Sequence, residues 1–335
     1  MTVRVGVIGV GMIGQDHIRR LSHVLSGVDV VAVSDVDVAR ATAVAEGLRS
    51  ARAFATGEEL IVDGNVDAVL VCSWGETHEQ YVLASIAAGK PVFCEKPLAT
   101  TQEACLRILD AETAAGRRLV QVGYMRRYDT AYRAVREVVH SGAIGLPLLM
   151  HCTHRNPGVP GYYKGESMIT DTAVHEIDLV RWLFDEEIAA TQVLVPRRSR
   201  NGGELQDPLV LLLEMASGLL VDVEISVNIR YGYDIRGEVV GEDGTVELCN
   251  PSPVRVRREG LAADRVPVDW RERFIRAYDV ELQEWVDAVA GGGDFGPSGW
   301  DGYAAAVVSD AALHALATGI RVPVALADKP DLYTK

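Results

Sequence analysis

Residues 3–14 of the chain, VRVGVIGVGMIG, decide the expected fold. Val3–Val10 is a short apolar run rich in β-branched residues, which is typical of a buried strand. Glycines follow at the spacing of a strand-to-helix turn that binds dinucleotides. The first glycine permits a tight turn, and the second lets the backbone approach a pyrophosphate. The third lets the helix pack on the strand. A plain glycine turn is the alternative. We expect the helix N-terminus to bind phosphate through Gly9, Gly11, Met12, Ile13 and Gly14.

Asp35 follows the next apolar run, Val28–Ser34, about 20 residues past the glycines, where such folds place an acidic residue. A carboxylate there can accept hydrogen bonds from the adenosine ribose hydroxyls, and it repels a 2′-phosphate. Val36 offers no compensating positive charge, so we expect NAD rather than NADP. Asp35 could also be a strand-end or helix-capping residue, and that role is compatible with the first.

The first third of the chain alternates apolar runs with helix-like stretches. Further apolar runs are Val28–Ser34, Ala68–Cys72, Val92–Cys94 and Leu119–Val122, and the helix-like stretches are Ile13–Leu25, Val38–Leu48, His78–Ala88 and Gln102–Ala115. Continuous apolar strands separated by helices predict a parallel sheet with both faces covered. We therefore expect an α/β Rossmann domain over residues 1–123.

After Gly123 the pattern changes to that of an α+β domain, expected over residues 124–335. Helices are expected at 129–140, 169–184, 271–290 and 301–318, and strands at 147–153, 191–195, 209–215, 219–229, 236–240 and 245–248. Short turns rich in Gly, Asn and Asp join the strands, which predicts an open, mostly antiparallel sheet.

The composition narrows the class of protein. The chain has 335 residues, of which 48% are hydrophobic and 24% charged, as in a folded protein of about two domains. The net charge of −14 disfavours nucleic acid and anionic membrane as partners, because both are polyanions. The five cysteines include no Cys-x-x-Cys pair, so we expect neither a disulfide framework nor a zinc site. No signal peptide or membrane span is recognisable, and a cytoplasmic location is expected.

Cys94-Glu95-Lys96-Pro97 follows the run Val92–Cys94. Pro97 ends the strand and places Lys96 at its carboxyl end, the edge where open α/β sheets bind ligands. A lysine there can bind a substrate hydroxyl and stabilise a developing alkoxide. A surface lysine before a turn explains this motif alone equally well.

Asp171, His175 and Asp178 are spaced to share one face near the start of a predicted helix. Asp171 could orient the His175 imidazole and stabilise its protonated form, as a general base requires. Ordinary polar contacts are the plain alternative. A divalent metal site is a third, but we expect no metal because no cysteine or second histidine lies at ligand spacing.

Further polar and aromatic residues follow expected strands and suit a nicotinamide site or a polyol pocket. They are Ser73, Trp74, His78, Arg126, His154, Asn156 and Tyr233. Ser73 and Trp74 could lie beside the nicotinamide, whereas His78 could equally cap the next helix. A structural role explains any one of these residues as well.

Together these features resemble the family of glucose–fructose oxidoreductase and inositol dehydrogenase over nearly the whole chain, and within it the bacterial inositol 2-dehydrogenase branch is the most similar. The resemblance is carried by GVIGVGMIG, VDAVLVCSWGETHE, VFCEKPLATT, RLVQVGYMRRYD, HCTHRNP, DTAVHEIDLVRWL, YGYDI and WDGYAAAV. It implies catalytic roles for Lys96, Asp171 and His175. It implies substrate contacts from these three residues and from Arg126, His154, Asn156 and Tyr233. Beyond the glycine-rich turn, the residues expected to contact NAD are Asp35, Val36, Ser73, Trp74, His78, Glu95 and Lys96.

The implied reaction is the oxidation of myo-inositol, with D-chiro-inositol as a further candidate, to a keto-inositol by NAD⁺ in inositol catabolism. The implied assembly is a homotetramer. The loop 158–167, GVPGYYKGES, matches less well and leaves the preference among inositols and aldoses open. An NAD-dependent dehydrogenase of a pyranose such as glucose and a non-catalytic sensor of NAD or sugar stay open as alternatives. A sensor needs no base, so the joint presence of Lys96, Asp171 and His175 argues against it.

Overall fold

The computed structural model describes residues 2–249, 252, 254–293 and 295–334, and the chain divides into two compact units. Unit 1 contains residues 1–124, 278–306 and 326–335, and unit 2 contains residues 125–277 and 307–325. The boundary expected after Gly123 lies one residue from the first change of unit, but the chain then returns to unit 1 twice. One boundary cannot describe this division, because helices α8 (Trp270–Gly291) and α9 (Gly299–Thr318) each contribute to both units.

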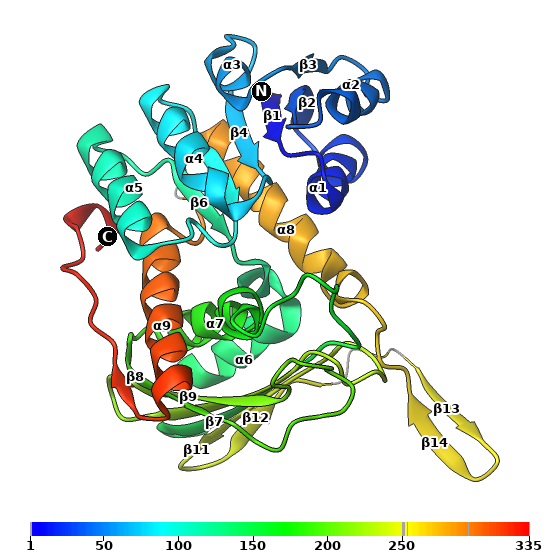
Figure 1. Ribbon diagram of the computed structural model, residues 1–335, viewed down its shortest axis with the longest axis vertical. Helices are drawn as coiled ribbons and strands as arrows, with labels where there is room; N and C mark the ends of the chain where they lie inside the picture. The colour runs from blue at the N-terminus through cyan, green and yellow to red at the C-terminus, as the bar shows by residue number, and fades with distance from the viewer. Residues whose placement is uncertain (1, 250–251, 253, 294, 335) are drawn as a thin grey trace. The chain divides into compact units, whose positions relative to one another are not determined.

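A six-stranded parallel sheet forms the centre of unit 1 (Figure 1). Its order, β3-β2-β1-β4-β5-β6, is that of the Rossmann fold, so the predicted class is confirmed. The strands are β1 (Val3–Ile8), β2 (Val28–Ser34), β3 (Arg52–Phe54), β4 (Ala68–Val71), β5 (Val92–Glu95) and β6 (Val120–Gly123). Strands β4, β5 and β6 are buried at every position, as expected where both faces of a sheet are covered.

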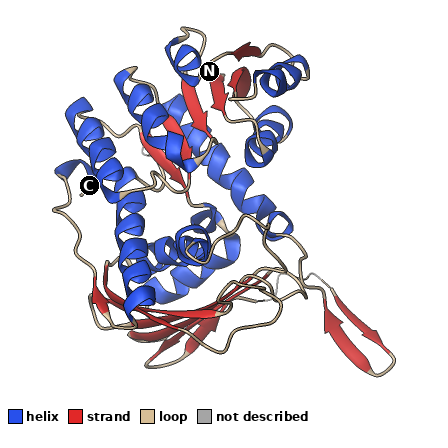
Figure 2. Ribbon diagram, in the orientation of Figure 1, coloured by secondary structure: helices blue, strands red, loops and turns tan. Residues whose placement is uncertain are grey.

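Helices connect these strands, as Figure 2 shows. They are α1 (Met12–His23), α2 (Val38–Glu46), α3 (Gly57–Val62), α4 (His78–Ala87) and α5 (Gln102–Ala115). The second half of α8 joins the same core, because Leu282, Trp285 and Val286 are buried in one cluster with residues of β1, β2, β4 and α1. Strand β3 and helix α3 were not expected from the sequence. Strand β3 is only three residues long and largely exposed, so it lacks the apolar run that reveals a buried strand.

Unit 2 is built on a seven-stranded sheet in the order β12-β11-β7-β10-β9-β8-β15. Its strands are β7 (Pro147–Arg155), β8 (Ile188–Leu194), β9 (Leu209–Met215), β10 (Leu220–Ser226), β11 (Asp234–Gly241), β12 (Thr245–Glu247) and β15 (Val322–Pro323). Neighbouring strands are antiparallel except β7 and β10, which run parallel. The expected mostly antiparallel sheet is therefore confirmed, with one parallel pair at its centre.

Helices α6 (Thr130–His140) and α7 (Val174–Phe184) also belong to unit 2. The single helix expected over 169–184 is corrected, because residues Met168–Ala173 form a π-helix in which the Val174 N–H bonds to the Ile169 carbonyl. A hairpin, β13 (Arg255–Arg258) and β14 (Leu261–Asp264), forms a separate two-stranded sheet that the sequence analysis did not predict. Within the described ranges, none of the helices combines the length and apolarity that crossing a membrane requires.

Candidate active site

The glycine-rich turn joins β1 to α1 at the carboxyl edge of the unit 1 sheet. Gly9 has a φ of +90°, and a Cβ there would lie 2.5 Å from the Ser73 nitrogen, so a side chain does not fit. A Cβ on Gly14 would lie 2.0 Å from the Gly9 carbonyl oxygen, which makes glycine necessary where the helix approaches the strand. At Gly11, apart from its neighbours along the chain, no atom among the described residues lies within 4 Å of the same position. The turn is thus tight on the protein side and open where a phosphate would approach.

Asp35 is fixed directly beside this turn. Its Oδ2 accepts the Val10 N–H at 2.8 Å and its Oδ1 accepts the Asp37 N–H at 2.9 Å. The Arg40 guanidinium, which the sequence analysis missed, also donates to Oδ1 at 2.6 Å. Burial raises the pKa of Asp35, but the Arg40 hydrogen bond and the two backbone hydrogen bonds outweigh it and hold this pKa below its ordinary value. The end of β2 therefore carries an anion, with Arg40 beside it.

Large apolar side chains are exposed where β1, β2 and β4 end. Met12 is 63% exposed, Val36 91% and Trp74 72%. The carboxyl ends of parallel strands lie along one edge of a sheet, so these three side chains mark that edge as apolar and uncovered. Exposed apolar surface at a binding edge indicates a surface that a ligand covers.

His78 was expected either at the cofactor or as a helix cap, and the structure buries it to 1% exposure. Its Nδ1 lies 2.6 Å from the Pro97 carbonyl oxygen, and its Nε2 lies 3.0 Å from the Ser73 carbonyl oxygen. Burial lowers the pKa of His78 and favours the neutral ring. The imidazole therefore lies between the turn after β4 and the turn that follows Lys96, and its single N–H can donate to only one of the two carbonyl oxygens.

Lys96 directly follows β5, at the same edge as the glycine-rich turn. Its backbone N–H donates to Oε2 of Glu95 at 3.2 Å, and Oε1 of Glu95 lies 2.7 Å from His17 Nε2. Burial raises the pKa of Glu95, but the His17 hydrogen bond and the positive charge of Lys96 outweigh it and keep this pKa below its ordinary value. Glu95 is thus a buried anion adjacent to Lys96.

In unit 2, four side chains meet around His154, near the end of β7. The Nδ1 atom of His154 lies 3.0 Å from Glu176 Oε2 and 3.1 Å from a terminal nitrogen of Arg126. Its Nε2 lies 3.5 Å from the Tyr233 hydroxyl, and the two rings pack edge-on with centroids 5.8 Å apart. The His175 ring centroid lies 6.4 Å from that of His154. The structure thus brings together the predicted residues Arg126, His154, His175 and Tyr233.

Glu176 is the member of this cluster that the sequence analysis missed. It is 1% exposed and forms an ion pair with Arg126, which is also 1% exposed. Burial raises the pKa of Glu176, but the positive charge of Arg126 and the hydrogen bonds from His154 and Arg126 hold it below its ordinary value. Burial also opposes the charged form of Arg126, yet the Glu176 carboxylate keeps the pKa of Arg126 above its ordinary value. Nδ1 of His154 therefore faces both the Glu176 carboxylate, which can only accept, and the Arg126 guanidinium, which can only donate.

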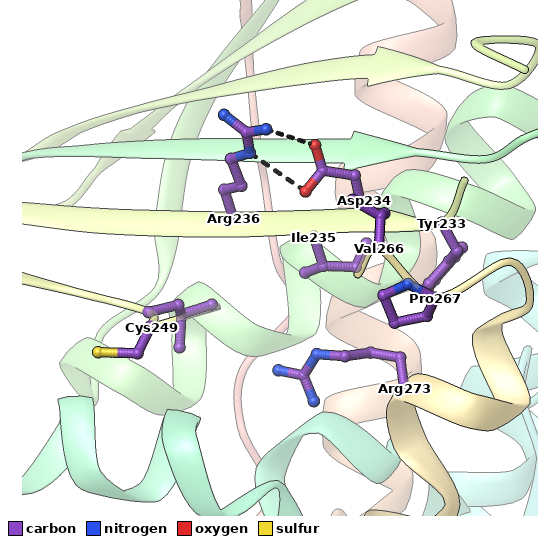
Figure 3. A pocket seen from close by; sticks show the side chains of 9 residues that line it. Tyr233, Asp234, Ile235, Arg236, Cys249, Val266, Pro267 and Arg273 are labelled. Carbon is purple, nitrogen blue, oxygen red and sulfur yellow. Dashed lines mark hydrogen bonds and ion pairs between the residues drawn. The ribbon is translucent and has the colours of Figure 1, made fainter. Parts of the chain in front are cut away.

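Tyr233 connects this cluster to a neighbouring pocket. Burial raises the pKa of Tyr233 to about 12, so its hydroxyl keeps its proton and can donate. Tyr233 also lines a pocket of about 170 Å³ (Figure 3). Both guanidinium groups that line the pocket are paired, Arg236 with Asp234 at 2.8 Å and Arg273 with Asp129 at 2.6 Å. The charges of the pocket are therefore compensated within the protein.

Asp171, His175 and Asp178 do not lie on one regular helical face. Asp171 is exposed in the π-helix, whereas His175 is 9% exposed in the first turn of α7. Asp178 is buried, and its two carboxylate oxygens accept from Arg127 at 2.9 and 2.5 Å. The expectation of a common stripe is corrected, because the π-helix interrupts the helical repeat and Asp178 is paired with Arg127.

Asn156 and the loop 158–167 follow β7. The Asn156 N–H donates to the Ser226 carbonyl at 2.8 Å, and the residue is half-buried. In the loop, the Tyr163 hydroxyl lies 2.6 Å from Thr172 Oγ1. The loop is thereby tied to the π-helix at the residue next to Asp171.

Comparisons with known proteins match both units. Residues 3–124 match the model of an oxidoreductase family with an NAD-binding Rossmann fold, and residues 132–247 match the GFO/IDH/MocA C-terminal domain. Inositol 2-dehydrogenase 3 of Saccharopolyspora erythraea is 56% identical over 99% of this chain and 98% of its own length. Inositol 2-dehydrogenase of Pseudomonas syringae pv. syringae is 52% identical over the whole of both chains.

One similar solved structure is that of myo-inositol dehydrogenase from Lactobacillus casei in complex with NAD(H) and myo-inositol. The match covers 100% of both chains, with a TM-score of 0.97 and 40% sequence identity. A probable dehydrogenase from Thermotoga maritima covers 96% of this chain and 98% of its own, with a TM-score of 0.89 and 31% identity. The sequence and the fold therefore agree over the full length, and the chain belongs to the GFO/IDH/MocA oxidoreductase family.

Proposed function

We propose that this protein is an NAD-dependent inositol 2-dehydrogenase, which oxidises one ring hydroxyl of myo-inositol to a ketone in inositol catabolism and has D-chiro-inositol as a second substrate. The observation that carries the proposal is 56% identity over 99% of the chain to a protein of that name. The Lactobacillus casei enzyme, whose structure contains NAD(H) and myo-inositol, adds support because its fold matches that of the whole chain.

The carboxyl edge of the unit 1 sheet offers the groups that NAD requires. The open space at Gly11 suits the pyrophosphate, and the Asp35 carboxylate suits the ribose hydroxyls. Trp74, at 72% exposure, offers an apolar surface beside the expected nicotinamide position. His78 would shape this edge through Ser73 and Pro97, because its ring is buried. When bound, the nicotinamide supplies the acceptor for the hydride.

We assign the proton and charge chemistry to three side chains. His175 takes the proton of the reacting hydroxyl as a general base. Lys96 donates a hydrogen bond to the same oxygen and stabilises the negative charge that develops on it. Asp171 supports the imidazolium that forms on His175. The ring contacts of His154 with both His175 and Tyr233 support a polyol site around this base.

His154, Asn156 and Tyr233 are proposed to contact the other hydroxyls of the ring. Arg126 is proposed to act through His154, because it is 1% exposed and engages Glu176. A site that matches each hydroxyl with a polar group discriminates strongly, since a missing or misplaced hydroxyl leaves a buried group unpaired. The oxidised carbon is proposed to be the one that bears the single axial hydroxyl of myo-inositol. Scyllo-inositol, which has no axial hydroxyl, should therefore be a poor substrate.

A substrate screen tests this function. Purified protein is mixed with NAD⁺ and, separately, with myo-, scyllo- and D-chiro-inositol and glucose, and NADH is followed by absorbance. We expect the highest kcat/KM with myo-inositol and a loss of roughly 10²-fold or more in Lys96→Met, the usual cost of removing a group that stabilises the developing oxyanion. Lys329→Met, at an exposed lysine, is the control. Faster oxidation of glucose would favour the pyranose alternative, and binding of NAD⁺ without turnover of any polyol would favour the sensor.

We also propose that the protein is a cytoplasmic homotetramer. The hairpin β13–β14 supports a subunit contact, because Val256 is 59% exposed and Leu261 73%. Both side chains lie on the same face of the hairpin, as their strand register requires. An isolated two-stranded sheet is marginally stable in water, so a neighbouring subunit would both cover this face and stabilise the hairpin. Sedimentation velocity of wild type and Leu261→Glu tests the assembly.

A further inference from the structure

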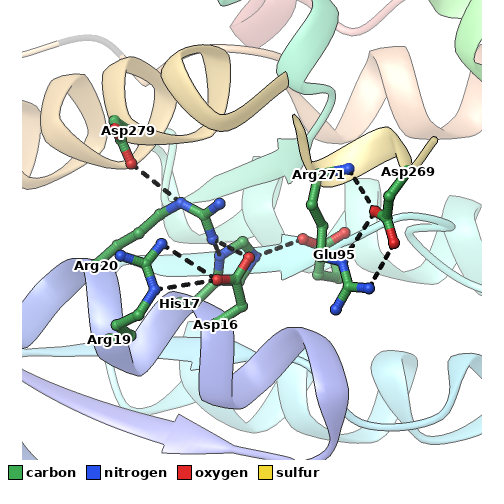
Figure 4. A network of polar contacts seen from close by, with 8 residues as sticks. All are labelled: Asp16, His17, Arg19, Arg20, Glu95, Asp269, Arg271 and Asp279. Atoms are coloured by element: carbon green, nitrogen blue, oxygen red, sulfur yellow. Dashed lines mark hydrogen bonds and ion pairs between the residues drawn. The ribbon is translucent and has the colours of Figure 1, made fainter. Parts of the chain in front are cut away.

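We propose that His17 is a positioning residue for Lys96 and that it acts through Glu95. The inference rests on the proposed function, in which Lys96 binds the reacting oxygen. His17 lies on α1 and is 0% exposed, and its Nε2 is 2.7 Å from Glu95 Oε1. The other Glu95 oxygen accepts the Lys96 backbone N–H at 3.2 Å. Figure 4 shows His17 between this carboxylate and Arg20.

Arg20 lies beside the ring nitrogen of His17 that faces away from Glu95. A guanidinium has only donors, and a terminal nitrogen of Arg20 lies 3.5 Å from His17 Nδ1. The Glu95 carboxylate can only accept, so Nε2 of His17 is the donor in the 2.7 Å contact with it. Arg20 is itself held by Asp16 at 2.5 Å and by Asp279 at 3.1 Å (Figure 4). The imidazole consequently presents one fixed donor to Glu95.

The consequence for Lys96 follows from the burial of Glu95, which is 8% exposed. Without the His17 donor, one oxygen of this carboxylate loses its buried partner, which favours rotation or protonation of the side chain. Either change releases the Lys96 N–H and removes the fixed negative charge beside the lysine. A shift of about 1 Å in a group that touches the reacting atoms can lower turnover roughly 10²-fold.

His17 also packs against aromatic rings, and this contact must be separated from its role as a donor. Its ring centroid lies 6.2 Å from that of Phe93 and 5.6 Å from that of Tyr278. His17→Phe keeps an aromatic ring but removes the donor, whereas His17→Gln restores a donor that can reach Glu95. His23→Phe, at an exposed position of the same helix, is the matched control.

Two readouts test the proposal. We expect kcat to fall roughly ten- to hundredfold in His17→Phe while KM for NAD⁺ changes little, and we expect His17→Gln to recover most of the loss. His17→Phe and Glu95→Gln should also be non-additive in kcat, because both break the same path to Lys96. Equal losses in His17→Phe and His17→Gln, or additive effects with Glu95→Gln, would overturn the proposal.

Amide hydrogen exchange provides the readout that does not depend on activity. Protection of the Lys96 N–H should drop in His17→Phe and remain in His17→Gln and His23→Phe. Unchanged protection in His17→Phe would overturn the positioning role even if the enzyme turned over as proposed. If wild-type protein formed no NADH with any cyclitol, the proposed function would fail, whereas the exchange result would still decide whether His17 positions Lys96.

Discussion

Replacing Glu176 with glutamine should destabilise unit 2 strongly. The carboxylate is 1% exposed and faces Arg126 and His154, so the substitution leaves the Arg126 charge buried without an anion. Removing one partner of a buried ion pair costs about 3–5 kcal/mol, and we expect a value of about 3 because the amide oxygen still accepts one hydrogen bond. At about 2–4 °C per kcal/mol for a unit of this size, Tm should fall by about 6–12 °C.

The effect should also depend on pH. The folded-state pKa of Glu176 lies below its unfolded value of about 4.3, so its contribution to stability is complete above that pH. The contribution is lost as the pH falls through the folded-state pKa, since the native carboxylate is then protonated. The difference in Tm between wild type and Glu176→Gln should therefore be constant near neutral pH and narrow below about pH 4.

Thermal unfolding followed by circular dichroism measures this difference. Glu204→Gln is the control, because the Glu204 side chain is fully exposed and its loss should cost less than about 0.5 kcal/mol. The double variant Arg126→Met with Glu176→Leu should be more stable than Glu176→Gln, because it removes both charges and fills the space with apolar atoms. A Tm for Glu176→Gln within the range of the control would refute the buried-pair reasoning.

Three further outcomes follow from the same structure. Asp35→Ser should raise kcat/KM with NADP⁺ relative to NAD⁺, because Arg40 could then pair with the 2′-phosphate, and adding Arg40→Met should remove the gain. His175→Ala should lower kcat roughly 10²–10⁴-fold, whereas NAD⁺ binding, measured by fluorescence titration, should persist. Near-normal turnover of this variant would mean that another residue is the base. A thiol reagent should modify Cys249 in the native protein before the cysteines that are buried, because burial raises the pKa of Cys72, Cys94 and Cys152.

The parallel sheet of unit 1 was predictable because its signals are local. A buried parallel strand is a continuous apolar run, and Val28–Ser34 was placed with its observed bounds for that reason. The glycine spacing was equally informative, since Gly9 and Gly14 each occupy a position where a Cβ would meet backbone atoms. Strand β3 has three residues and is largely exposed, so it lacks an apolar run that could reveal it.

The polar partners were not predictable because they lie far apart in the sequence. Arg126 and Glu176 are separated by 50 positions, and His17 and Glu95 by 78. No local spacing relates such residues, so only the fold reveals that each pair meets in a buried place. The return of α8 to the unit 1 core is similar, because the burial of Trp285 depends on packing with distant strands.

The π-helix at Met168–Ala173 was missed for another reason. The hydrogen bond from the Val174 N–H to the Ile169 carbonyl, five residues earlier, distinguishes it from an α-helical turn, and apolar spacing does not reveal such a bond. π-Helical turns occur frequently at functional sites. This one contains Asp171 and leads directly to His175, which agrees with the proposed catalytic pair.

The transfer of a labelled hydrogen tests the central claim most directly. The protein is incubated with NAD⁺ and with myo-inositol that carries deuterium only on the carbon bearing the axial hydroxyl, and the NADH formed is analysed by mass spectrometry. The proposed reaction predicts NADH that carries the deuterium and a keto-inositol that has lost it. Formation of unlabelled NADH, or of no NADH at all, would contradict the assignment of this protein as an inositol 2-dehydrogenase.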